Sequence, residues 1–227
     1  MHSSTLTHPM RGAVATGARR ATPAPLLPFV SITVRTALWS VLLGIGLIAP
    51  FMIAASYSTP SEVVRLKMGA VPLHPLTFLF ASGLLGPLLE EVVYRGFLQG
   101  ILRRYAPLWV AVVVPSAVFA ATHIVPAGWA YLNAFPMACL FSWLVLRSGS
   151  LVASLLCHCT FNLTAGLALT PIFHLAEKLL DRAPRAPFNP LFDLFPVWWT
   201  ALSLVLIGSA LIMIHRDTAS RRAASHA

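Results

Sequence analysis

Residues 83–98 read GLLGPLLEEVVYRGFL, an apolar run that is interrupted by two glutamates and an arginine. The apolar run extends from about residue 72 to residue 102, which is longer than the roughly 20 residues that a helix needs to cross a bilayer. An ionisable side chain at bilayer depth costs about 2.5 to 3.5 kcal/mol on insertion scales. We therefore expect Glu90, Glu91 and Arg95 to be paired or to serve a function inside the membrane.

The composition of the whole chain also indicates a membrane protein. Of its 227 residues, 57% are hydrophobic and 10% are charged, and the mean hydropathy is +0.77, which leaves too little polar surface to coat a soluble globule. Its 3 cysteines are too few for a disulfide scaffold. The net charge of +9 is spread between apolar runs rather than gathered in one patch, so it predicts membrane topology and no nucleic-acid partner.

The apolar runs predict an all-α, polytopic integral membrane protein with about six transmembrane helices. The runs fall at about residues 36–61, 72–102, 107–125, 127–146, 150–173 and 196–214. With the N-terminus inside, ten of the 16 basic residues fall on the cytoplasmic side and five on the other, while Arg95 lies within a span. The positive-inside rule then predicts that both termini are cytoplasmic. We therefore expect a multi-pass protein that lies in the bacterial inner membrane.

One transmembrane domain with two basic ends is the predicted organisation. Residues 1–35 are rich in Ala, Thr, Pro and Arg and contain no acidic residue, which is typical of a disordered arm. The helical domain is expected to cover residues 36–215, with its chemical motifs within 83–166, and residues 216–227 form a basic cytoplasmic tail.

Helix geometry predicts different surroundings for the two glutamates. Residues four apart share one face of a helix, whereas consecutive residues point about 100° apart. Glu91 can therefore pair with Arg95, as a salt bridge that clamps neighbouring helices. Glu90 lies off that face, and we expect it to point toward another helix or a wet cavity, where a carboxylate could act as a general base.

Other polar side chains lie in the third and fifth predicted spans. His123 follows Phe119 by one helical turn, and His158 and Asn162 share one helix face. At about 1.5 Å per residue from the estimated cytoplasmic ends, Glu90, His123, His158 and Asn162 all lie roughly 15 to 24 Å deep. Three helices could therefore present these four side chains to one cavity near the middle of the membrane.

A set of one glutamate, two histidines and one asparagine suits hydrolysis by water. A carboxylate can take a proton from water, an imidazole can hold that water, and a histidine N–H with an asparagine amide can donate to the developing oxyanion. The chain has no HExxH zinc motif and no GxSxG elbow, and its aspartates lie outside the predicted spans. A metal held by one Glu and two His stays open as an alternative.

Three motifs in this chain resemble those of the CAAX-protease and bacteriocin-processing family, which are intramembrane glutamic endopeptidases and include the type II CAAX prenyl endopeptidases. The motifs are EExxxR at residues 90–95, FxxxH at 119–123 and HxxxN at 158–162. They occur in the order of the family and all lie in apolar runs, and the resemblance covers about residues 83–166. One departure is Ala138, which stands where relatives often carry glycine.

The resemblance implies that Glu90 and His123 activate the water and that His158 and Asn162 form the oxyanion hole. It implies a supporting role for Glu91, Arg95 and Phe119, and it implies no cofactor and no metal. The expected activity is that of a membrane-embedded endopeptidase acting on a membrane-anchored protein or peptide in the lipid bilayer. Two other functions stay open from the sequence, namely a non-catalytic scaffold or bacteriocin-immunity-type protein, and a transporter or proton relay that uses the same buried groups.

Overall fold

The computed structural model describes residues 27–51, 75–123, 130–180 and 197–224, which form helices and, within these ranges, no strand. The first part of the bundle comprises α1 (Val34–Gly46) and a segmented helix in which α-helical and π-helical pieces alternate. The pieces of this segmented helix are α4 (Pro75–Phe80), η1 (Ala81–Leu85), α5 (Gly86–Glu90), η2 (Glu91–Leu98) and α6 (Gln99–Tyr105). The remaining helices are α7 (Leu108–Thr122), α8 (Ala130–Ser148), α9 (Leu151–Leu180) and α11 (Val197–Ala224).

The all-helical fold predicted from the apolar runs is confirmed within the described ranges. Two described helical segments, Val34–Phe51 and Trp199–Ala224, are long and apolar enough to cross a membrane. Three further apolar helices are shorter, at Leu108–Thr122, Ala134–Ser148 and Leu151–Leu167. The number of six spans and the cytoplasmic side of both termini stay predictions. Parts of the predicted runs, at residues 52–61, 72–74, 124–125, 127–129 and 196, lie outside the described residues.

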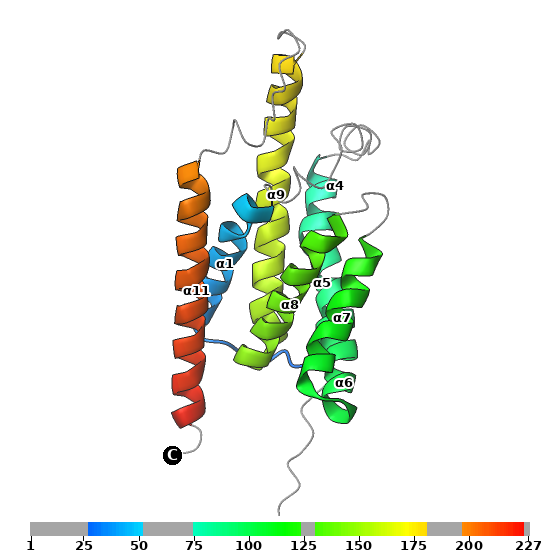
Figure 1. Ribbon diagram of the computed structural model, residues 1–227, viewed down its shortest axis with the longest axis vertical. Coiled ribbons are helices and arrows are strands. Elements are labelled where there is room, and N and C mark those ends of the chain that lie inside the picture. The colour runs from blue at the N-terminus through cyan, green and yellow to red at the C-terminus, as the bar shows by residue number, and fades with distance from the viewer. Residues whose placement is uncertain (1–26, 52–74, 124–129, 181–196, 225–227) are drawn as a thin grey trace, which may run out of the picture.

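The central element of the bundle is α9. It packs against α1 on one side and against α8, η1, α5 and η2 on the other, while α11 lies along α1 and α7 lies along α8 (Figure 1). Leu43, Phe141, Leu144 and Ile214 are fully buried where α1, α8 and α11 meet. The middle of α9 therefore reaches both halves of the bundle, and His158 and Asn162 lie on this helix.

Two glycines allow α9 to approach its neighbours closely. A Cβ atom on Gly44 of α1 would lie 2.5 Å from the carbonyl oxygen of Cys157. A Cβ atom on Gly83 of η1 would collide with the side chain of Leu163. Both contacts flank the part of α9 that carries His158, so they fix where this histidine stands.

The turn between α8 and α9 is held by the segment before α1. Gly149 has a φ of 72°, a left-handed conformation that glycine adopts without steric cost. Leu151 donates its backbone N–H to the carbonyl of Pro28 at 2.9 Å, and Ser150 donates its hydroxyl to the carbonyl of Val30. The last residues of the predicted basic arm are thus ordered against this turn, while residues 1–26 lie outside the described part of the chain.

At the other predicted boundary, α11 continues as a helix to Ala224, which is beyond the predicted end of the domain at residue 215. The side chain of Asp217 accepts hydrogen bonds from the hydroxyls of Thr33 and Thr36. This contact ties the last turns of α11 to the start of α1, which explains why the helix does not end with the apolar run.

Candidate active site

The glutamate doublet lies at the junction between α5 and the π-helix η2. Glu90 is the last residue of α5 and Glu91 is the first residue of η2. Glu91 has 1% of its side chain exposed, whereas Glu90 has 32% exposed. The two carboxylates therefore point into different surroundings, and π-helical turns of this kind occur often at functional sites.

Glu91 belongs to a buried ionic cluster. Its Oε1 lies 3.1 Å from Nη1 of Arg95, which is the ion pair that the i,i+4 spacing predicts. The same oxygen lies 3.0 Å from Nδ1 of His158. This second contact is not encoded by any local spacing, because it joins η2 to the middle of α9. A single carboxylate thus links Arg95 and His158.

Arg95 is held from several directions. Its Nη2 donates to the carbonyl of Ala138 at 3.1 Å, and its guanidinium carbon lies 4.6 Å from the ring centre of Phe119 and 5.2 Å from that of Phe141. A guanidinium close to aromatic rings gains cation–π attraction, which is larger where water is absent. These contacts compensate the buried charge and fix the position of Glu91.

Glu90 lies between the two imidazoles that the motifs predicted. Its Oε2 is 3.5 Å from Nε2 of His158, and its Oε1 is 3.9 Å from Nε2 of His123. Both separations exceed an ordinary hydrogen bond of about 2.7 to 3.2 Å. Each carboxylate oxygen therefore faces one imidazole nitrogen across a short gap.

His123 is positioned by its own helix. It is the C-cap residue of α7, and its Nδ1 lies 2.9 Å from the carbonyl oxygen of Phe119. Because a carbonyl only accepts hydrogen bonds, the pattern assigns the proton to Nδ1, and Nε2 of the neutral ring is then an acceptor. The ring of His123 also packs on that of Phe119, with centres 4.5 Å apart. Nε2 is left facing Glu90.

His158 is held more tightly than His123. Its Nδ1 faces Oε1 of Glu91, and its ring stacks on Phe141 with centres 4.5 Å apart and planes at 22°. The ring of Phe119 also contacts that of His158 in a T-shaped arrangement, with centres 5.9 Å apart. The side chain of His158 is 5% exposed, whereas that of His123 is 41% exposed.

Asn162, the fourth predicted residue, lies one turn beyond His158 on α9 and contacts η1. Its Nδ2 donates to the carbonyl of Ser82 at 2.8 Å. A carboxamide carries two N–H donors, so this bond uses only one of them. The structure thus brings Glu90, His123 and His158 together and places Asn162 against the neighbouring π-helix.

Phe119 has several partners in the site, but sequence reasoning missed Phe141. Phe119 packs on His123, His158 and Arg95, and also on Tyr94, with ring centres 5.3 Å apart. Phe141 is fully buried and covers both His158 and Arg95. A phenylalanine in an apolar span carries no signal of its own, since such residues are common there. Its role follows only from the packing of α8 against α9.

Among the described residues, no group of three or more His, Cys, Asp or Glu side chains is arranged to hold a metal ion. The metal-dependent alternative therefore rests on the sequence pattern alone.

Ionisable side chains buried among apolar helices mark a functional site in a membrane protein. The family model described as type II CAAX prenyl endopeptidase Rce1-like matches residues 72–164, a segment that contains all three motifs. This segment matches the Rce1-like family, so the resemblance predicted from the motifs is confirmed over these residues. Members of this family are integral membrane proteases that act on membrane-anchored proteins. No curated protein and no solved structure matches the chain.

Proposed function

We propose that this protein is an intramembrane endopeptidase in which Glu90 activates a water molecule to hydrolyse a peptide bond. The observation that carries the proposal is the position of the Glu90 carboxylate between Nε2 of His123 and Nε2 of His158, at 3.9 and 3.5 Å. The partial exposure of Glu90 supports access for water and substrate, in contrast to the buried Glu91.

The hydrogen-bond pattern around His123 supports a water-binding role. With its proton on Nδ1, the Nε2 atom of His123 and the carboxylate of Glu90 are both acceptors. Two acceptors separated by 3.9 Å do not bond to each other, but a water molecule can donate one hydrogen to each. The lone pair of that water then faces away from both groups. In this proposal Glu90 takes the proton as the oxygen attacks the peptide carbonyl, so no acyl-enzyme forms.

His158 and Asn162 are the proposed oxyanion donors. An imidazole between two carboxylates donates to both when each of its nitrogens carries a proton. A developing oxyanion that forms beside Glu90 can then accept from the Nε2–H of His158. The second N–H of the Asn162 amide is the other donor, while the first donates to the carbonyl of Ser82. Arg95 and Glu91 act as positioning residues because they hold His158 through its Nδ1.

The proposed substrate is a membrane-anchored protein or peptide. The match of residues 72–164 to the Rce1-like family and the apolar bundle that surrounds the site support this proposal. The proposed location is the bacterial inner membrane, with both termini on the cytoplasmic side. The substrate is expected to reach Glu90 from the bilayer or its surface.

Reconstituted protein and the near-isosteric change Glu90→Gln test this function. Purified wild-type protein in proteoliposomes is incubated with a fluorogenic farnesylated CAAX peptide, and membranes of cells carrying either form are compared for a protein with a longer C-terminal tail. We expect cleavage by the wild type and only a residual rate, about 1,000-fold lower, by Glu90→Gln, with equal melting temperatures. Equal turnover by a folded Glu90→Gln protein would exclude Glu90 as the base. A cellular phenotype that survives this change but is lost on disrupting helix packing would favour the scaffold function.

A further inference from the structure

The segmented helix that carries the glutamate doublet is joined to α8 by two side-chain hydrogen bonds. Arg95 donates from Nη2 to the carbonyl of Ala138 at 3.1 Å, and Gln99 donates from Nε2 to the carbonyl of Ser142 at 3.3 Å. The two donors are four residues apart on one helix, and the two acceptors are four residues apart on the other. The first bond belongs to the ionic cluster around Glu91, whereas the second lies one turn farther along.

The position of Gln99 relates it to Glu90 through the π-helix η2. Glu90 is the N-cap residue of η2 and Gln99 is its C-cap residue, where regular α-helix resumes as α6. Stretches of π-helix are rare and mostly consist of single turns, so contacts with neighbouring helices must stabilise one that covers Glu91–Leu98. The bond from Gln99 to α8 is such a contact, and it holds the end of η2 that is farther from Glu90.

Gln99 is not explained by folding stability. Its side chain is fully buried, and its Oε1 has no hydrogen-bond partner among the described residues. A buried acceptor without a partner costs stability, and well-packed apolar residues in place of buried polar groups are often neutral or stabilising. A buried polar side chain can instead fix the register of neighbouring helices.

The residue that accepts from Gln99 also contacts α7, the helix of His123. The hydroxyl of Ser142 lies 3.5 Å from that of Ser116, and both side chains are fully buried. Ser116 precedes His123 by about two helical turns, so the two residues lie on the same side of α7. Gln99, Ser142 and Ser116, here called the Gln99 row, therefore connect the helix of Glu90 to the helix of His123.

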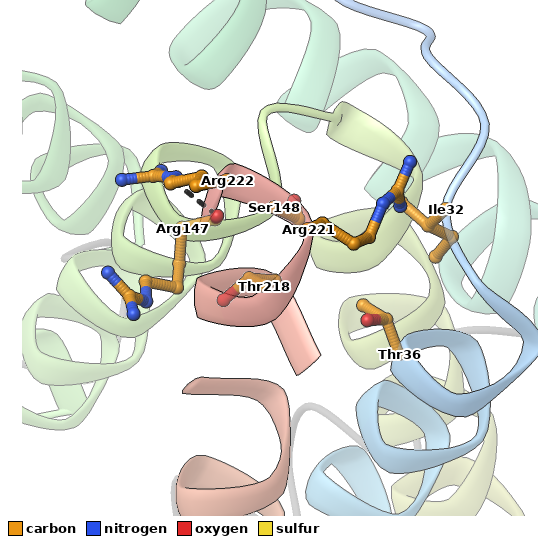
Figure 2. Close-up of a pocket in the computed structure, with 7 residues that line it drawn as sticks. All are labelled: Ile32, Thr36, Arg147, Ser148, Thr218, Arg221 and Arg222. Atoms are coloured by element: carbon orange, nitrogen blue, oxygen red, sulfur yellow. Dashed lines mark hydrogen bonds between the residues drawn. The ribbon is translucent and has the colours of Figure 1, made fainter. Parts of the chain in front are cut away.

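The helix in the middle of the Gln99 row, α8, is itself anchored to α11. Figure 2 shows Arg222 of α11 beside Arg147 at the end of α8. Arg222 donates to the carbonyls of Leu146 and Arg147, at 2.7 and 3.1 Å. Arg147 in turn donates from Nη2 to the carbonyl of His215 on α11 at 3.2 Å. The end of η2 is thus attached to a neighbour that is held in place.

We propose that Gln99 is a positioning residue, which sets the separation between the Glu90 carboxylate and the His123 imidazole by holding the far end of η2 against α8. This inference rests on the proposed function, because it affects catalysis only if Glu90 and His123 act on one water molecule. Arg95 restrains His158 through the ionic cluster. The Gln99 row supplies the corresponding restraint toward His123.

The variants Gln99→Leu and Gln99→Met test the inference, because both remove the hydrogen bond to Ser142 and keep most of the volume. In the proteoliposome assay we expect kcat and kcat/KM to fall together by about tenfold, as for a misplaced reactive group. The melting temperature should equal or exceed that of the wild type. Ser40→Ala is the matched control and should keep the wild-type rate, because Ser40 is also fully buried and its hydroxyl donates to a carbonyl of its own helix, α1.

A readout that needs no turnover separates this inference from the proposed function. The imidazole nitrogen NMR signals of the full-length protein in nanodiscs are compared between the wild type and the same variants, with the His123 signals assigned from their loss in His123→Ala. We expect the His123 signals to shift in both Gln99 variants and to stay unchanged in Ser40→Ala.

Each outcome distinguishes the two proposals. Unchanged His123 signals in the Gln99 variants would overturn the positioning role, whether or not the wild type cleaves the peptide. A loss of cleavage that follows a lower melting temperature in both variants would also overturn it, because Gln99 would then only bind helices together. A wild type that cleaves nothing would contradict the proposed function, while shifted His123 signals would still support positioning by Gln99.

Discussion

Glu90 and Glu91 are neighbours in the chain, yet they occupy opposite kinds of environment. Glu91 is almost fully buried and is fixed by Arg95 at 3.1 Å and by His158 at 3.0 Å. Glu90 is one-third exposed and lies 3.5 and 3.9 Å from two imidazoles. The difference shows how one helix junction can supply both a rigid support and a loosely held reactive group. The buried half of the site costs stability if broken, whereas the exposed half can change with little effect on folding.

The largest expected effect is a loss of cleavage when the exposed half of the site, which contains Glu90 and His123, is changed. His123→Ala removes the imidazole that faces Oε1 of Glu90, and we expect cleavage to fall by roughly 100-fold or more, as for other lost acid–base groups. The melting temperature should change little, because this side chain is 41% exposed. His215→Ala, an exposed histidine on α11, is the control. A large loss of stability in His123→Ala would show that the two halves are not separable.

Changes in the buried half of the site, which contains Glu91, should instead lower the thermal stability. Glu91→Gln leaves the buried Arg95 charge without its partner, and breaking such a pair costs roughly 3 to 5 kcal/mol. We expect the melting temperature to fall by about 10 °C, as measured by the thermal unfolding of purified protein. Glu90→Gln is the matched control and should stay within about 0.5 kcal/mol of the wild type. Equal melting of both variants would refute the contrast between the glutamates.

A smaller loss of stability is expected from a change at the close contact between α1 and α9. Gly44→Ala places a methyl group 2.5 Å from the carbonyl oxygen of Cys157, the residue before His158. Overpacking of this kind costs roughly 1 to 3 kcal/mol, and the shift of α9 should lower cleavage as well. Gly208→Ala has nothing within 4 Å of the new methyl group and should be neutral or stabilising. Similar melting curves for the two variants would argue against this close approach.

The smallest effect is expected from the aromatic support of the buried half. Phe141→Leu removes the ring that stacks on His158 at 4.5 Å and lies 5.2 Å from the guanidinium of Arg95. Such contacts contribute about 0.5 to 1.5 kcal/mol beyond area burial, so a loss of about 1 kcal/mol is expected in chemical unfolding. Phe97→Leu, at a 55% exposed position, provides the control.

Local spacing predicted the parts of the site that lie within single helices. The Glu91–Arg95 pair and the different directions of Glu90 and Glu91 follow from helical geometry, and the structure contains both. The packing of Phe119 on His123 also follows from an i,i+4 spacing. These features depend on residues one turn apart, for which the sequence alone is sufficient.

Contacts between helices could not be predicted in the same way. The bond from His158 to Glu91 and the bond from Asn162 to the Ser82 carbonyl depend on how α9 packs against η1 and η2. The π-helical turns have no sequence signature that reasoning from an α-helical period can detect.

The central claim, that Glu90 and His123 act on one water molecule, is tested most directly by a double-mutant cycle on the single-turnover cleavage rate. Residues that act as a unit are strongly non-additive in their effects on catalysis. We therefore predict that Glu90→Gln combined with His123→Ala cleaves no more slowly than Glu90→Gln alone. A double variant whose loss equals the product of the two separate losses would contradict a shared water.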